Sequence, residues 1–133
     1  PDTLVQRQAE AWDPLLDWAA SGLGAPLVMT SGIMHVDQPS GSLATLQSHV
    51  RALTPFEVAA LHDLVALSGS LVIGLAVLHR ALDTEELWTR SRIDETFQAE
   101  QWGVDEEAAE VAARKKGDFL HAARFLSLCT ETA

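Results

Sequence analysis

The stretch from Trp88 to Gly103 carries the residues best suited to chemistry, because it places a carboxylate and an amide between two tryptophans. At about 100° per helical residue, spacings of three and four bring residues onto one face. Five residues share that narrow arc: Trp88, Ser91, Glu95, Gln98 and Trp102. Apolar residues, Ile93 and Phe97, fall on the opposite side, so the pattern predicts a helix that is partly buried all round. Glu95 then occupies a position typical of leucine, where a carboxylate must be paired internally or must await a partner from outside.

The residues alone leave three interpretations of this face open. Glu95 and Gln98 can form a buried hydrogen-bond network with Arg92, Ser91 or an indole nitrogen, or they can bind a partner molecule. Trp88 and Trp102, taken alone, are typical of core aromatics. Glu95 could also serve as the general base of a hydrolase or lyase, although the sequence supplies no second positioned catalytic group.

Other catalytic and metal-binding patterns are missing from the sequence. Five histidines occur, at positions 35, 49, 62, 79 and 121, but none has the spacing of a helical metal site, and Asp118-x-x-His121 comes nearest. His62 and Asp63 are adjacent in the sequence, so on a helix their side chains point about 100° apart, and we interpret them as a polar pair. There is no phosphate-binding glycine loop and no nucleophile elbow. We therefore expect no catalytic residue, no metal, no cofactor and no small-molecule substrate.

Composition narrows the classes of partner. The chain has 133 residues, 47% of them hydrophobic, which suits one domain with one core. A net charge of −10 argues against nucleic-acid binding, because only Arg114-Lys115-Lys116 forms a basic cluster. The uncharged run from Leu64 to Leu78 is shorter than the roughly 20 residues that a bilayer requires, so it predicts a buried core helix and no stable membrane insertion. The single cysteine, Cys129, excludes an internal disulfide and fits a reducing compartment.

Start and stop signals divide the chain into helices. Asp2 or Thr3 can cap a first helix that Asp13-Pro14 restarts or kinks and that Gly22 and Gly24 end. The helical period is lost between residues 27 and 42, which predicts a short irregular segment with extended pieces at 27–29 and 33–36. A further helix follows to Ala52.

The second half of the chain has stronger signals. Thr54 to Glu57 is a capping box with proline at the first helical position, and it opens an apolar run to Leu78. The serines and glycines at 68–70 and Gly74 either divide this run or allow a neighbouring helix to approach closely. Asp83 is expected to cap one helix that contains Trp88 and Trp102, and Asp105 the last helix. The sequence thus predicts an all-α fold: a compact orthogonal bundle of about six helices around a central apolar helix, with an irregular segment near 27–42.

Three separated motifs resemble one known family. They are Trp12-Asp-Pro-Leu-Leu16 with Gly24-Ala-Pro26; Leu61-His-Asp-Leu-Val-x-Leu-Ser-Gly-Ser70; and Trp88 followed by Ser91-Arg-x-x-Glu95, Gln98 and Trp102-Gly103. Together they resemble the assembly chaperone of mitochondria and bacteria that holds the alpha subunit of the F-type ATP synthase head. The matches extend from about Ala11 to Leu126. The family's strand-rich amino-terminal domain has no counterpart here, so we expect residues 1–133 to form a single helical domain, the carboxy-terminal domain of a longer chain.

The resemblance implies a function and a site. The protein would be a non-enzymatic chaperone that binds the unassembled alpha subunit, prevents its aggregation and releases it to the beta subunit. It would act in the cytoplasm of a bacterium or the mitochondrial matrix of a eukaryote. The family's functional glutamate maps to Glu95, with Gln98, Trp102 and Trp88 as its setting; Asp94 adjoins Glu95, but the tryptophans share the face of Glu95. The alternative is a helical self-association module without chaperone activity.

Overall fold

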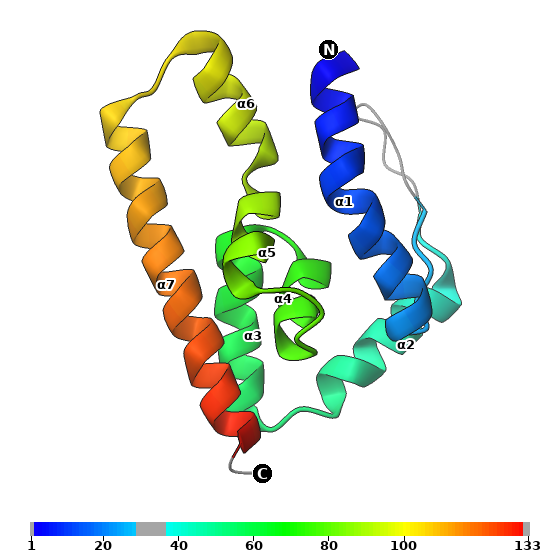
Figure 1. Ribbon diagram of the computed structural model, residues 1–133. Coiled ribbons are helices and arrows are strands. Elements are labelled where there is room, and N and C mark those ends of the chain that lie inside the picture. The colour runs from blue at the N-terminus through cyan, green and yellow to red at the C-terminus, as the bar shows by residue number, and fades with distance from the viewer. Residues whose placement is uncertain (1, 29–36, 132–133) are drawn as a thin grey trace.

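The protein is an all-α domain (Figure 1). The computed structural model describes residues 2–28 and 37–131 and contains no strand within them. Its helices are α1 (Asp2–Gly22), α2 (Ser40–Arg51), α3 (Pro55–Ser68), α4 (Leu71–Leu78), α5 (Thr84–Ser91), α6 (Ile93–Trp102) and α7 (Glu106–Glu131). The predicted fold class is confirmed, and the described residues form seven helices where about six were expected.

Helix α1 continues through Pro14, so of the two outcomes expected at Asp13-Pro14, a restart or a kink, the restart is wrong. The helix buries Ala11, Leu15 and Ala19 on one face, while Pro14 lies on the exposed side. There, water can solvate the carbonyl that a proline leaves without its amide partner. The helix ends at Gly22, as predicted.

The irregular segment near 27–42 is confirmed only at its edges. Residues 27–28 and 37–39 have no regular secondary structure, and α2 begins at Ser40. The two edges are joined by Gln38, whose amide accepts a hydrogen bond from Val28 N at 2.8 Å and donates one to Val28 O at 3.0 Å. The extended pieces predicted at 29 and 33–36 lie outside the described residues.

The apolar run from the capping box to Leu78 is divided in two. Thr54 and Glu57 form the predicted capping box, with reciprocal bonds of 3.3 and 3.0 Å. Gly69 ends α3 with a left-handed φ of 75°, and the hydroxyl of Ser70 accepts the Ile73 amide at 3.1 Å to start α4. The structure thus selects division of the run, and the predicted close approach also occurs, because a Cβ at Gly74 would lie only 3.0 Å from side-chain atoms of α3.

The central position belongs to α4 and not to the whole apolar run. Residues 73–77 of α4 are all buried. Helix α3 buries one face only, and Phe56 near its start is 68% exposed. A single central helix from 58 to 78, buried all round, is therefore wrong in detail, because the turn at Gly69 lets α4 fold back into the core while α3 keeps a solvent face.

The predicted single helix from Trp88 to Trp102 is broken at Arg92 into α5 and α6. Asp83 does occupy the N-cap of α5, but its side chain makes no capping bond. Asp105 caps α7 as predicted, accepting the Glu107 amide at 2.9 Å.

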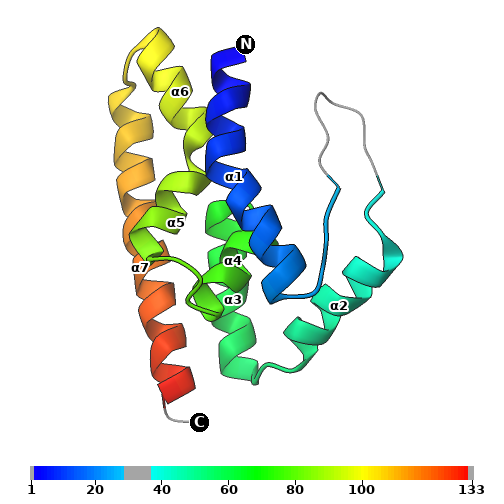
Figure 2. The same ribbon diagram turned by 45° about the vertical axis from the view of Figure 1, so that its right-hand side comes forward.

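The core lies where α3 and α7 run side by side, with α4 and α5 packed across them (Figures 1 and 2). Its largest fully buried side chains are Phe119, Leu64, Leu87 and Leu126, while Leu75 belongs to a second cluster with Leu23 and Leu46. Helix α6 instead packs on α1, beside the amino-terminal half of α7. Among the described helices, none combines the length and apolar character needed to cross a membrane.

Candidate functional site

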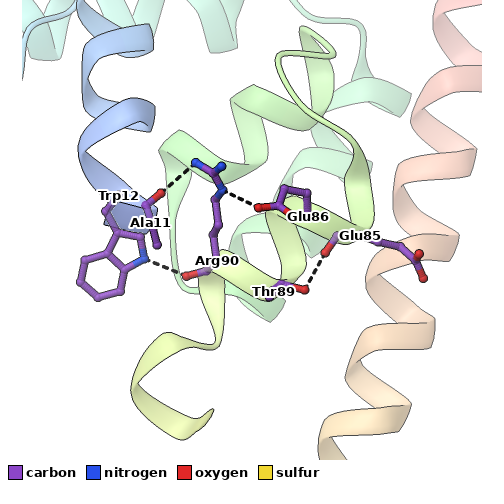
Figure 3. Close-up of polar contacts among 6 residues, drawn as sticks. All are labelled: Ala11, Trp12, Glu85, Glu86, Thr89 and Arg90. Carbon is purple, nitrogen blue, oxygen red and sulfur yellow. Dashed lines mark hydrogen bonds and ion pairs between the residues drawn. The ribbon is translucent and has the colours of Figure 1, made fainter. Parts of the chain in front are cut away.

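A polar clamp between α1 and α5 fixes the helix that carries Trp88 (Figure 3). The Trp12 indole N–H donates to the carbonyl of Arg90 at 2.7 Å. The Arg90 guanidinium donates in return to the carbonyl of Ala11 at 3.1 Å and to Glu86 at 3.0 Å. Charge-assisted bonds of this kind are stronger than neutral ones, so the clamp sets the position of α5 against α1. The sequence offered one signal for it, since the indole N–H of a partly buried tryptophan needs an acceptor.

Trp88 belongs to the core. It is 5% exposed and packs on Phe119 with ring centroids 5.2 Å apart. The guanidinium of Arg92 lies 5.6 Å from the centre of the same ring, a cation–π distance. The core interpretation of Trp88 is therefore right, although the residue also lines the groove described below.

The helix break comes directly after Trp88. Ser91 donates its hydroxyl to the Trp88 carbonyl at 2.6 Å, and Arg92 leaves the helical region with φ −107° and ψ 16°. Serine side chains that compete for backbone carbonyls favour helix ends and bends.

Contacts with α1 then hold α6. Arg7 forms an ion pair with Glu100, its guanidinium lies 5.6 Å from the centre of the buried Phe97 ring, and Gln8 donates to Asp94 at 2.6 Å.

A groove of about 580 Å³ lies between α6 and the amino-terminal half of α7. It contains all four residues of the predicted binding site, Trp88, Glu95, Gln98 and Trp102. The rest of its lining comes from α5, α6, the turn and α7: Thr89, Arg92, Thr96, Ala99, Gly103, Val104, Asp105, Ala108, Ala109, Ala112 and Lys116. The break at Arg92 therefore changes the helix but keeps these four side chains on one surface.

Glu95 is not the buried carboxylate that the helical pattern predicted. Its side chain is 52% exposed and lies 3.7 Å from the Arg92 guanidinium. Water and the Arg92 guanidinium together stabilise the negative charge, so the partial burial of this carboxylate costs little free energy. Asp94, in contrast, contacts Gln8 of α1 and does not line the groove, which favours Glu95 as the groove carboxylate.

Trp102, unlike Trp88, does not belong to the core. Its side chain is 88% exposed, so the predicted burial of this helix on all sides is wrong. Burial on two sides would require α7 to close over α6. Instead α6 packs against α1, which leaves Trp102 exposed in the lining of the groove with Val104, itself 71% exposed.

The α7 wall was missed by sequence reasoning. It consists of Ala108, Ala109 and Ala112, with Lys116 one helical turn beyond Ala112. Alanines carry little side chain beyond the backbone, so the wall leaves open space where leucines would have met α6 and closed a core. The alanine-rich start of the last helix was the available signal.

The groove suits binding better than catalysis. Among its described lining residues the only carboxylates are Glu95, paired with Arg92, and Asp105, which caps α7. Across the described parts of the chain, no group of three or more histidine, cysteine, aspartate or glutamate residues could hold a metal ion. His62 and Asp63 lie on an exposed surface with 3.5 Å between Nδ1 and Oδ1.

Two solved structures are closely similar to this chain. A solved structure of Atp12 from Paracoccus denitrificans superposes with a TM-score of 0.93 at 49% identity, covering 96% of this chain and 55% of that one. A structure of a candidate chaperone from Agrobacterium tumefaciens gives a TM-score of 0.90 at 41% identity, covering 96% of this chain and 48% of that one.

By sequence, the mitochondrial atp12 protein of Schizosaccharomyces pombe is 24% identical over 131 residues, 96% of this chain and 45% of that protein. The chain thus spans about half the length of these relatives. No family model matches it.

Proposed function

This chain is homologous to Atp12, the ATP synthase assembly chaperone, and from that premise we propose that it binds the unassembled alpha subunit of the catalytic head and keeps it from aggregating. Binding takes place in the groove between α6 and α7. Release follows when the beta subunit takes the place of the chaperone on the alpha subunit.

The observation that carries this proposal is the combination of Trp102 with Glu95 and Gln98 in one open groove. A tryptophan that is 88% exposed on a small domain is costly to leave in water and is the residue type most enriched at binding hot spots. An exposed carboxylate and amide beside it supply directional contacts that select a partner. Apolar area gives affinity, and the polar pair gives selectivity.

Competition with the beta subunit would release the alpha subunit without any chemical reaction. A holder that covers the same surface as the beta subunit is displaced by mass action and needs no nucleotide. We therefore propose a non-enzymatic role, at the place where the catalytic head is assembled: the cytoplasm of a bacterium or the mitochondrial matrix.

The test compares Glu95→Lys with Asp118→Lys. Asp118 is exposed on α7 outside the groove, so both variants make the same charge change. Glu95 forms a half-exposed ion pair, and such a pair contributes only about 0 to 1 kcal/mol, so both variants should melt close to wild type. Unfolded alpha subunit is diluted with each protein and light scattering is recorded. We expect wild type and Asp118→Lys to suppress aggregation and Glu95→Lys to fail.

Two results would overturn this proposal in different ways. A large fall in melting temperature for Glu95→Lys alone would make Glu95 a structural residue. Aggregation in the presence of folded wild-type protein would remove the chaperone function itself. The self-association module would then become the leading hypothesis, and a size in solution that rises with concentration would support it.

A further inference from the structure

The acidity of the domain is concentrated at one end. We call residues 94–113 the acidic tip; they comprise most of α6, the turn at Gly103 and the first two turns of α7. The tip holds seven aspartates and glutamates and no lysine or arginine, so it carries −7 of the chain's net charge of −10. The rest of the chain carries only −3, so the tip is a local feature and not a sample of a uniformly acidic surface.

Internal contacts explain part of this charge. Two of the seven carboxylates are neutralised by arginines, Glu100 by Arg7 and Glu95 by Arg92. The other five have no ion-pair partner within the described residues: Asp94, Asp105, Glu106, Glu107 and Glu110. Acidic residues in the first turn of α7 are favoured by the helix dipole, but Glu110 lies beyond that turn.

The same end carries the most exposed apolar side chains of the groove. Trp102 and Val104 are 88% and 71% exposed, and both line the groove with Asp105. The groove's two cations are each paired with a carboxylate, Arg92 with Glu95 and Lys116 with Glu85 at 3.5 Å. An adjoining hollow of about 380 Å³ on α7 contains Asp105, Glu107 and Val111 together with two cations, Arg92 and Lys115.

From this arrangement we propose that the groove accepts a protein segment whose apolar side chains enter beside Trp102 and whose lysines or arginines pass the acidic tip. The inference rests on the proposed function and specifies the kind of alpha-subunit segment that is held. At physiological salt, charges act over about 8 Å, so the carboxylates attract a passing cation without touching it. The same field repels anionic lipid and nucleic acid.

Two designed peptides test this directly. Both are amphipathic helices of about 18 residues, or five turns, with one leucine stripe, and they differ only in having lysine or glutamate on the polar face. Binding of each labelled peptide to the whole chain is measured by fluorescence anisotropy at low and high salt. We expect the lysine peptide to bind at least about tenfold more tightly than the glutamate peptide and to lose affinity as salt rises.

Paired variants locate the effect at the tip. Glu107→Gln with Glu110→Gln removes two tip charges, and Asp17→Asn with Asp118→Asn removes two exposed charges elsewhere, so both proteins have a net charge of −8. We expect the tip pair to slow association of the lysine peptide about threefold at low salt and the control pair to leave it nearly unchanged. Circular dichroism checks that both fold.

The outcomes separate this inference from the proposed function. Equal binding of the two peptides, equal effects of the two variant pairs, or protection of the alpha subunit without binding of either peptide would each overturn the inference and leave the function standing. A lysine peptide that binds selectively and competes with the alpha subunit confirms it. Selective peptide binding by a chain that fails to protect the subunit would confirm the chemistry of the groove and overturn the proposed client.

Discussion

Replacing each groove tryptophan by alanine should separate stability from binding, because the two rings line one surface with opposite burial. Trp88 is 5% exposed and packs on Phe119, with Arg92 over its face. Truncating a buried tryptophan costs about 3 to 5 kcal/mol. For a domain of this size that corresponds to a fall in melting temperature of about 10 to 20 °C.

Trp102→Ala should behave in the opposite way. The ring is 88% exposed, so its removal takes little apolar area out of a packed environment and should change stability by no more than about 0.5 kcal/mol. If the ring is a hot spot for the partner, its loss should weaken binding by about 2 kcal/mol or more, roughly 30-fold in Kd.

Urea denaturation followed by circular dichroism gives the stability of both variants, and surface-immobilised alpha subunit gives their affinity. The reasoning would be refuted in its structural part if Trp102→Ala unfolded as readily as Trp88→Ala. Unchanged affinity in a folded Trp102→Ala protein would instead refute the placement of the partner in the groove.

Two further predictions concern the core. Gly74→Ala should destabilise the domain by about 1 to 3 kcal/mol in urea, because the new Cβ would lie 3.0 Å from Leu61 and Val65 side-chain atoms; an unchanged midpoint would mean that α3 can move away. Partial desolvation, reinforced by the neighbouring His49, lowers the pKa of His79 below its ordinary value of 6.5 in the folded state. The unfolded chain therefore takes up the proton first, so this contribution to stability is complete above pH 6.5 and is lost as pH falls from 6.5 through the lower folded pKa; a His79→Gln variant that keeps the same decline in unfolding free energy would contradict this.

Local signals predicted helix ends well where the cap lies within the sequence motif. The capping box at Thr54 and the Asp105 cap depend on residues within a few positions, so the sequence predicted both, whereas at Gly69 it left division of the apolar run and a close helix approach open. The grouping of Glu95 with Trp102 was equally local, because it depends on helical spacing.

Burial could not be predicted in the same way. Nothing in the spacing of Trp88 and Trp102 says that one ring meets Phe119 while the other meets water, because that depends on where α7 lies. The break at Arg92 also lacks a glycine or proline, and it depends on the Ser91 hydroxyl together with the packing of Arg92 over Trp88. The position of Glu95 was therefore assigned to the correct face with the wrong environment.

The two walls of the groove belong to different parts of the fold. Helix α6 is anchored on α1 through Arg7 and Gln8, whereas α7 is anchored on α3, and the turn at residues 103–105 joins the two walls. The spacing between the walls is thus set indirectly, through the core. A bound segment would contact both walls, so it would hold them apart and also link them. A surface of this kind can accommodate side chains of different sizes with little rearrangement of the domain, which agrees with the proposed reversible binding of an unassembled subunit.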